Sequence, residues 1–137
     1  MMNNKFQDYY KKNRLRVEEV IKGIVKIDQI ENVDFKEDVR VMNRIENSSF
    51  LVKDKKVSIL TSVLKKFFQI LEKEKSLFYE YKYDLLECLT DLLKALQASE
   101  KSAEKPQTSL NEYNKLDDHT SFFENIIFKL NEKKRYY

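Results

Sequence analysis

The sequence is short of the two residues that shape tight turns, since it contains one glycine, Gly23, and one proline, Pro106, among 137 residues. Sheet proteins depend on glycine for the positive φ of hairpin turns and for bulges. The P-loop and the dinucleotide-binding motif each need at least two glycines, so both nucleotide motifs are excluded. The composition therefore favours helices over strands.

Cysteine and histidine are equally scarce, with Cys88 and His119 as the single copies. One cysteine cannot form a disulfide within the chain, and this pair cannot complete a zinc site of the cysteine-rich kind. The first residues carry no apolar run that could serve as a secretory signal, and no stretch approaches the roughly 18 apolar residues of a membrane span. We expect no cofactor, no membrane span, and a cytoplasmic or other reducing intracellular compartment.

The sequence does contain enough apolar material for one core. Hydrophobic residues make up 42% and aromatic residues 12% of the chain, beside 36% charged residues. A chain of this length matches the commonest size of one domain, and Lys, Glu, Leu, Gln and Arg are all good helix formers. The sequence therefore predicts an all-α fold, a compact bundle of four to six helices, as a single domain over residues 1–137.

Apolar residues at spacings of three and four predict where the helices lie. We expect a first helix over 5–27, in which Gly23 marks either a close helix contact or an early helix end, and a short second helix from Asp34 to 47–49. The stretch 57–97 would form a single helix about 60 Å long. Because 72–76 holds no apolar residue, we expect a central helical hairpin there, with one long helix as the alternative. A flexible linker is predicted at 98–109, followed by a last helix with capping boxes at Ser109 and Ser121.

Two groups of residues could carry chemistry, and the sequence argues against both. One is an acidic stripe formed on a helix by Asp84, Glu87 and Asp91. A di-metal bundle site also needs glutamates three residues before histidines, whereas a leucine stands three residues before His119. The other is Cys88 with His119, but Cys88 lies among leucines, where cysteine behaves as a small hydrophobic residue. The sequence predicts no catalytic residue and no metal site.

Doubled aromatic residues predict a second apolar surface. Phe67 and Phe68 point about 100° apart on a helix, as do Phe122 and Phe123, so one core face cannot easily take both members of a pair. A wider core is the alternative explanation. The candidate interface with a protein partner or a second copy consists of Phe67, Phe68, Phe78, Tyr79, Tyr81, Phe122 and Phe123.

Basic residues mixed with tyrosines form a further pattern, although the net charge of the chain is only +3. Cations hold phosphates and aromatic rings stack on exposed bases, so these clusters suit RNA or single-stranded DNA. Ordinary solvated helix faces are the alternative. The candidate nucleic-acid contacts are Lys11, Lys12, Arg14, Arg16, Lys55, Lys56, Lys65, Lys66, Lys133, Lys134 and Arg135.

These patterns lead to one main hypothesis and two alternatives. We expect a non-catalytic protein–protein interaction module, a small helical adaptor or subunit of a larger assembly, because catalytic parts are missing while aromatic residues are in excess. The first alternative is a nucleic-acid-associated helical subunit that uses the basic clusters. The second is an enzyme, which would need the acidic stripe, or Cys88 and His119, to converge in a pocket.

Overall fold

The computed structural model describes the backbone of residues 4–102 and 111–135 and the side chains of 6–101 and 114–133. These backbone ranges contain helices and no strand. The helices are α1 (Asn4–Val25), the short 3₁₀ helix η1 (Ile30–Asn32), α2 (Lys36–Leu51), α3 (Lys55–Lys73), α4 (Leu77–Ser102) and α5 (Asn111–Arg135). The predicted all-α bundle is confirmed. None of these helices has both the length and the apolar content that a membrane span needs.

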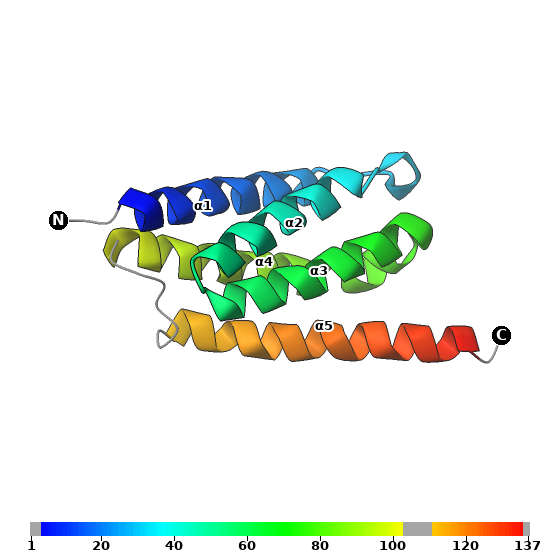
Figure 1. Ribbon diagram of the computed structural model, residues 1–137. Helices are drawn as coiled ribbons and strands as arrows, with labels where there is room; N and C mark the ends of the chain where they lie inside the picture. The colour runs from blue at the N-terminus through cyan, green and yellow to red at the C-terminus, as the bar shows by residue number, and fades with distance from the viewer. Residues whose placement is uncertain (1–3, 103–110, 136–137) are drawn as a thin grey trace.

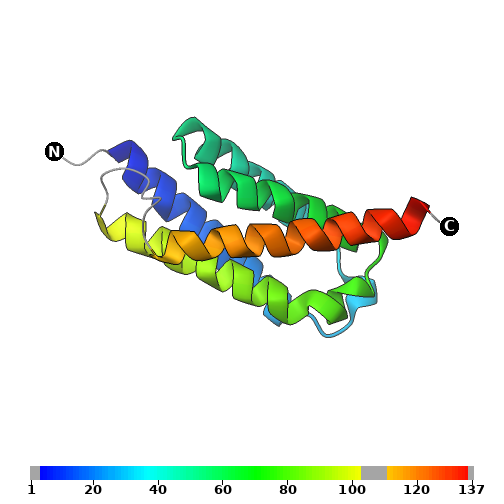
Figure 2. The same ribbon diagram turned by 90° about the horizontal axis from the view of Figure 1, so that it is seen from below.

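Successive α-helices run in alternating directions along the bundle (Figure 1). α1 packs mainly against α4, and α2 packs mainly against α3. α5 lies across the seam between α3 and α4 and contacts both of them (Figure 2). The two helices of the predicted central hairpin, α3 and α4, contact each other only sparingly, since α5 packs against both.

The break predicted at 72–76 is confirmed, and the alternative of one long helix is wrong. α3 ends at Lys73, and the backbone N–H of Glu74 still donates to the carbonyl oxygen of Ile70 at 2.9 Å. α4 then begins at Leu77. A stretch without apolar side chains has no apolar face to pack against a neighbouring helix. The helix therefore ends there and the chain reverses direction.

The flexible linker predicted at 98–109 is wrong over its first residues, because α4 continues through Ser102. Ser99 is buried, and Glu100 forms an ion pair with Arg14 of α1 at 2.5 Å. These contacts with the neighbouring helix hold a polar stretch in the helical state. The rest of the predicted linker, 103–110, lies outside the described residues.

One core runs through the bundle, and it takes in four of the seven aromatic residues that the sequence assigned to an interface. Phe67 and Phe68 are both fully buried on different faces of α3, so the wider core that stood as the alternative explanation accounts for this pair. α3 has α2 on one side and α5 on another, and both faces are therefore covered. The ring of Phe68 lies 6.0 Å from Phe35, and the ring of Phe67 lies 5.0 Å from Phe123. Phe78 and Phe123 are also buried, which removes four of the five phenylalanines from the candidate interface and leaves Phe122.

Candidate binding surfaces

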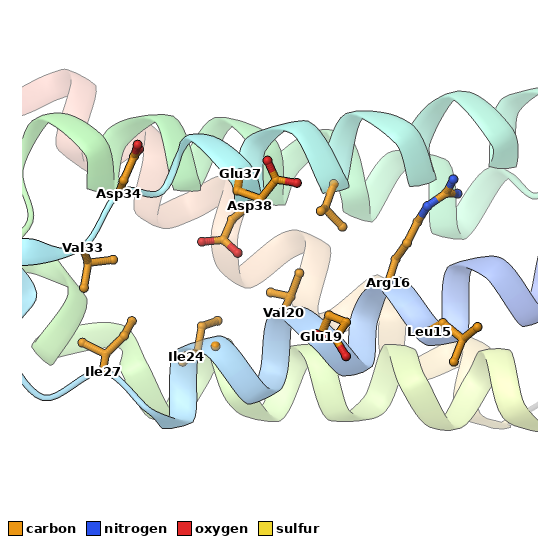
Figure 3. A pocket seen from close by; sticks show the side chains of 12 residues that line it. Leu15, Arg16, Glu19, Val20, Ile24, Ile27, Val33, Asp34, Glu37 and Asp38 are labelled. Atoms are coloured by element: carbon orange, nitrogen blue, oxygen red, sulfur yellow. The ribbon is translucent and has the colours of Figure 1, made fainter.

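A groove of about 680 Å³ lies between α1 and α2 (Figure 3). These two helices contact each other less extensively than either contacts its main neighbour, which leaves room between them. The apolar part of the lining comes from both helices and from the connection between them. It consists of Leu15, Val20, Ile24, Ile27, Val33 and Val41.

Carboxylates dominate the polar part of this lining. They are Glu19 on α1, Asp34 in the connection before α2, and Glu37 and Asp38 in the first turn of α2, against a single cation, Arg16. In Figure 3, Asp38 points from α2 into the gap toward α1. We refer to this hollow, with its apolar side chains and four carboxylates, as the acidic groove.

Asp38 is the carboxylate whose surroundings change its chemistry most. Its side chain is largely buried, and this burial raises the pKa of the carboxyl to about 7. The negative charges of Glu37, Asp34 and Glu72 raise the pKa further in the same direction. Within the part of the chain that the structure describes, no cation pairs with Asp38. A cationic group placed in the groove would therefore favour its charged form.

Two exposed carboxylates of the groove form only weak ion pairs. Glu37 pairs with Arg40 at 2.6 Å, and Glu19 lies 3.8 Å from Lys22, in both cases with well-exposed side chains. Exposed pairs of this kind contribute about 0–1 kcal/mol. They can exchange at little cost for a cation supplied by a ligand.

Arg16 does not neutralise the groove. Its guanidinium donates a hydrogen bond to Asn13 Oδ1 at 2.9 Å, on its own helix. Burial lowers the pKa of Arg16, and the positive charge of Arg44 lowers it further. In Figure 3 it stands apart from Asp34 and Asp38, which lie toward the other end of the groove.

A second candidate surface lies where α2 meets α3. Phe50 is 75% exposed, Leu51 is 73% exposed and Ile59 is 52% exposed. Together with Lys53 and Lys55 they line a hollow of about 660 Å³. We refer to Phe50, Leu51, Ile59, Lys53 and Lys55 as the turn patch.

This patch was not predicted, because the polar residues at 47–49 predict the end of the second helix there. α2 in fact continues to Leu51, so two bulky apolar residues stand at the very end of a helix. The sequence did contain a feature that could have predicted these two exposed residues. Phe50 and Leu51 follow a polar run and come directly before a lysine-rich segment, where a buried helix face is not expected.

The remaining residues of the predicted interface are only partly available. Tyr79 is 54% exposed, Phe122 is 40% exposed and Tyr81 is half-buried. Each of these rings packs against a buried neighbour: Tyr79 on Phe78, Phe122 on Phe123 and Tyr81 on Phe67. The exposed rings belong to different helices, α4 and α5. A role for them in an interface stays a prediction.

Several of the predicted nucleic-acid contacts are already engaged by carboxylates. The pairs are Lys12 with Asp8 at 3.0 Å, Arg14 with Glu100 at 2.5 Å, Lys56 with Asp117 at 2.8 Å and Lys65 with Glu46 at 2.7 Å. The exposed cations of the set that form none of these ion pairs are spread over α1, α3 and α5, and they are Lys11, Lys55, Lys66 and Lys133. The side chains of Lys134 and Arg135 lie outside the described residues. Nucleic-acid contact therefore stays a prediction.

The single cysteine and the single histidine serve the packing of α4 and α5. Cys88 is buried, and this burial raises the pKa of its thiol, with Asp91 and Glu87 adding to the effect. His119 Nε2 of α5 lies 2.7 Å from Asp91 Oδ2 of α4, a contact that the sequence did not predict. Across residues 4–102 and 111–135, no three His, Cys, Asp or Glu side chains group as metal ligands. One residue of the acidic stripe of Asp84, Glu87 and Asp91 is thus engaged in a contact between helices, namely Asp91.

Of these surfaces, the acidic groove has the chemistry best suited to a ligand. An apolar lining beside carboxylates that have only weak exposed ion pairs, or in the case of Asp38 no paired cation among the described residues, matches a partner that presents apolar side chains flanked by cations. Along α1 the lining extends from Leu15 to Ile24, a distance of about 14 Å, which equals two to three turns of a bound helix. Known proteins supply no ligand by analogy, because the chain matches no protein-family model, no curated protein and no solved structure.

Proposed function

We propose that the protein is a non-catalytic interaction module that binds a cationic amphipathic segment of a protein partner in the acidic groove. The observation that supports this function is the meeting of an apolar lining and four carboxylates in one groove. One of those carboxylates, Asp38, is largely buried and has no paired cation among the described residues. A helical segment would place apolar anchors into the groove at every third or fourth position.

The apolar anchors would supply most of the affinity. Burying one leucine or phenylalanine side chain contributes about 1.5–3 kcal/mol, whereas an exposed ion pair contributes about 0–1 kcal/mol. Association also costs translational and side-chain freedom. We therefore expect a dissociation constant on the order of 10 µM for a short peptide, with the carboxylates setting its orientation and its rate of association.

The test uses a fluorescein-labelled peptide of about 14 residues that carries leucines on one face and lysines on the other. Anisotropy measures its binding to the unmodified chain and to a variant with Glu19→Lys and Glu37→Lys. Both side chains are exposed, so this groove variant should fold normally and bind at least about ten-fold more weakly. The matched control is Glu87→Lys with Glu124→Lys, which changes the net charge equally at exposed positions outside the groove.

A second variant removes the groove without changing any charge. Gly23 lines the groove, and a Cβ at this position would meet no atom within 4 Å. The substitution Gly23→Leu should therefore fill the groove, keep the helix and abolish peptide binding. Unchanged peptide affinity in both the groove variant and Gly23→Leu would show that the proposed function is wrong. A peptide with glutamates in place of its lysines should not bind the unmodified chain.

A further inference from the structure

We infer that the acidic groove binds the turn patch of a second copy of this chain, so that the protein associates head to tail. This inference rests on the proposed function, because it names the partner segment that the groove takes. It is carried by the complementary chemistry of two surfaces that lie on the same molecule. Each surface alone is an unpartnered apolar region, and each has what the other lacks.

The turn patch presents the features that the groove demands. Phe50, Leu51 and Ile59 offer exposed apolar side chains, and Lys53 and Lys55 flank them with exposed cations. No carboxylate pairs with either lysine among the described side chains. Apolar anchors between cations thus face an apolar lining between carboxylates, which is the complementarity that specific interfaces use.

The two surfaces cannot meet within one copy. Both belong partly to α2, where the groove uses Asp38 near the start and the patch uses Phe50 near the end. Twelve helical residues separate these two positions by about 18 Å along a rigid rod. The patch can therefore reach only the groove of another copy.

Charge also selects the head-to-tail arrangement over a symmetric one. Two turn patches placed face to face would bring Lys53 and Lys55 of one copy against the same lysines of the other. Two grooves placed face to face would oppose their carboxylates, Asp38 and Glu37 among them. Like charges brought together in an interface are costly, so patch-to-patch and groove-to-groove contacts are disfavoured.

The position and rigidity of the turn suit it to enter a groove. The connection between α2 and α3 lies toward the end of the bundle where α1 begins and α4 ends (Figure 1), and the side chains of Phe50 and Leu51 beside it are exposed. The backbone N–H of Asp54 donates to the carbonyl oxygen of Ser49 at 2.8 Å, and Tyr9 of α1 donates to the Asp54 carboxylate at 2.8 Å. The turn is thus held before it binds, which reduces the entropy lost on association.

Head-to-tail contacts do not close after one step. Each added copy leaves one groove and one turn patch unoccupied, so the assembly grows into a ring or an open chain. Each contact involves few side chains and falls at the small end of protein interfaces. We therefore expect an association that appears only at high protein concentration, with a dissociation constant on the order of 100 µM.

Sedimentation velocity of the full chain tests the inference between about 10 µM and about 1 mM. The average mass should rise above the 16.5 kDa of one copy as the concentration increases. A patch variant with Phe50→Asp and Leu51→Asp should stay at the mass of one copy, as should the groove variant with Glu19→Lys and Glu37→Lys. The control, Tyr83→Asp with Phe128→Asp, alters two exposed apolar residues elsewhere and should associate like the unmodified chain.

The decisive sample is an equimolar mixture of the patch variant and the groove variant. The intact patch of one should enter the intact groove of the other, which gives a particle of twice 16.5 kDa that grows no further. A mixture that stays at the mass of one copy overturns the inference. So does an unmodified chain that remains monomeric over the whole concentration range.

The leucine–lysine peptide separates this inference from the proposed function. If the peptide binds the groove while the unmodified chain stays monomeric, the head-to-tail inference is wrong and the proposed function stands. If the variants pair but the peptide does not bind, the groove accepts the turn patch and not a general cationic helix. If both statements are correct, adding the peptide should return the assembled chain to the mass of one copy.

Discussion

Tyr9 donates a hydrogen bond from its hydroxyl to Asp54 Oδ2 at 2.8 Å, and both residues are buried. The same hydroxyl lies 2.8 Å from Ser49 Oγ. One tyrosine near the start of α1 therefore holds both sides of the connection between α2 and α3. The turn patch is fixed to the bundle through this residue, which joins parts of the chain that lie far apart in sequence.

The first prediction is that Tyr9→Phe lowers the free energy of unfolding by about 1–3 kcal/mol, because buried polar groups on Asp54 and Ser49 lose a hydrogen-bond partner. Urea unfolding followed by circular dichroism measures the change. Tyr83→Phe is the control, since Tyr83 is exposed and its hydroxyl should matter by less than about 0.5 kcal/mol. Equal effects of the two substitutions would contradict the role given to Tyr9.

The second prediction concerns Lys53, which has a φ of 62° in the turn between α2 and α3. Side chains with a Cβ are disfavoured in this left-handed region, whereas glycine adopts it readily. Lys53→Gly should therefore raise the free energy of unfolding by about 0.5–1 kcal/mol, measured by urea unfolding. Lys55→Gly should instead lower it, because Lys55 begins α3 and glycine is a poor helix former. A destabilised Lys53→Gly protein would show that the turn is not strained.

The third prediction uses the raised pKa of Asp38. The unfolded carboxyl loses its proton near its ordinary value of 3.8, whereas the folded carboxyl keeps it up to about 7. Ionisation of Asp38 therefore lowers the free energy of unfolding progressively as the pH rises from 3.8 to about 7. Above pH 7 the destabilisation by Asp38 is complete. Asp38→Asn should stabilise the fold by about 1–3 kcal/mol above neutral pH and by almost nothing near pH 4.

Urea unfolding of both proteins at several pH values checks this prediction. Glu124→Gln is the control, because it removes one negative charge from an exposed position on α5 outside the groove. A stability difference between Asp38→Asn and the unmodified chain that stays constant with pH would contradict the raised pKa. Bound leucine–lysine peptide should lower that pKa, since a cation favours the carboxylate.

The sequence was sufficient to predict an all-α fold and the place where α3 ends. The scarcity of glycine excluded a sheet protein, and the polar run at 72–76 marked the turn between α3 and α4. Both features are local, because they depend on turn geometry and on the apolar spacing of single helices. The end of α4, in contrast, depends on a contact between residues that lie far apart in the sequence. Glu100 is held by Arg14, which lies 86 residues earlier in the chain.

The candidate surfaces depended on helix arrangement, which apolar spacing does not reveal. Phe67 and Phe68 point apart on one helix, but α3 has neighbours on both of those sides and buries both rings. The acidic groove lies between α1 and α2, which contact each other little because they pack mainly against α4 and α3. Asp34, Glu37 and Asp38 were visible in the sequence as acidic residues. Their meeting with Val20 and its apolar neighbours was not.

The last prediction concerns Gly23, for which a close helix contact was one interpretation. That interpretation is wrong, because a Cβ at this position would meet no atom within 4 Å. α1 continues past Gly23 to Val25, so the glycine stands inside a helix without a steric need for it.

Gly23→Ala should therefore raise the free energy of unfolding by about 0.5–1 kcal/mol, because alanine loses less backbone entropy in a helix. The midpoint of thermal unfolding should rise by about 2–4 °C. Lys22→Ala, at the preceding exposed position, is the control and should shift it far less. A lower midpoint for Gly23→Ala would mean that the methyl group meets a neighbour, in which case α1 and α2 lie closer together than the groove requires.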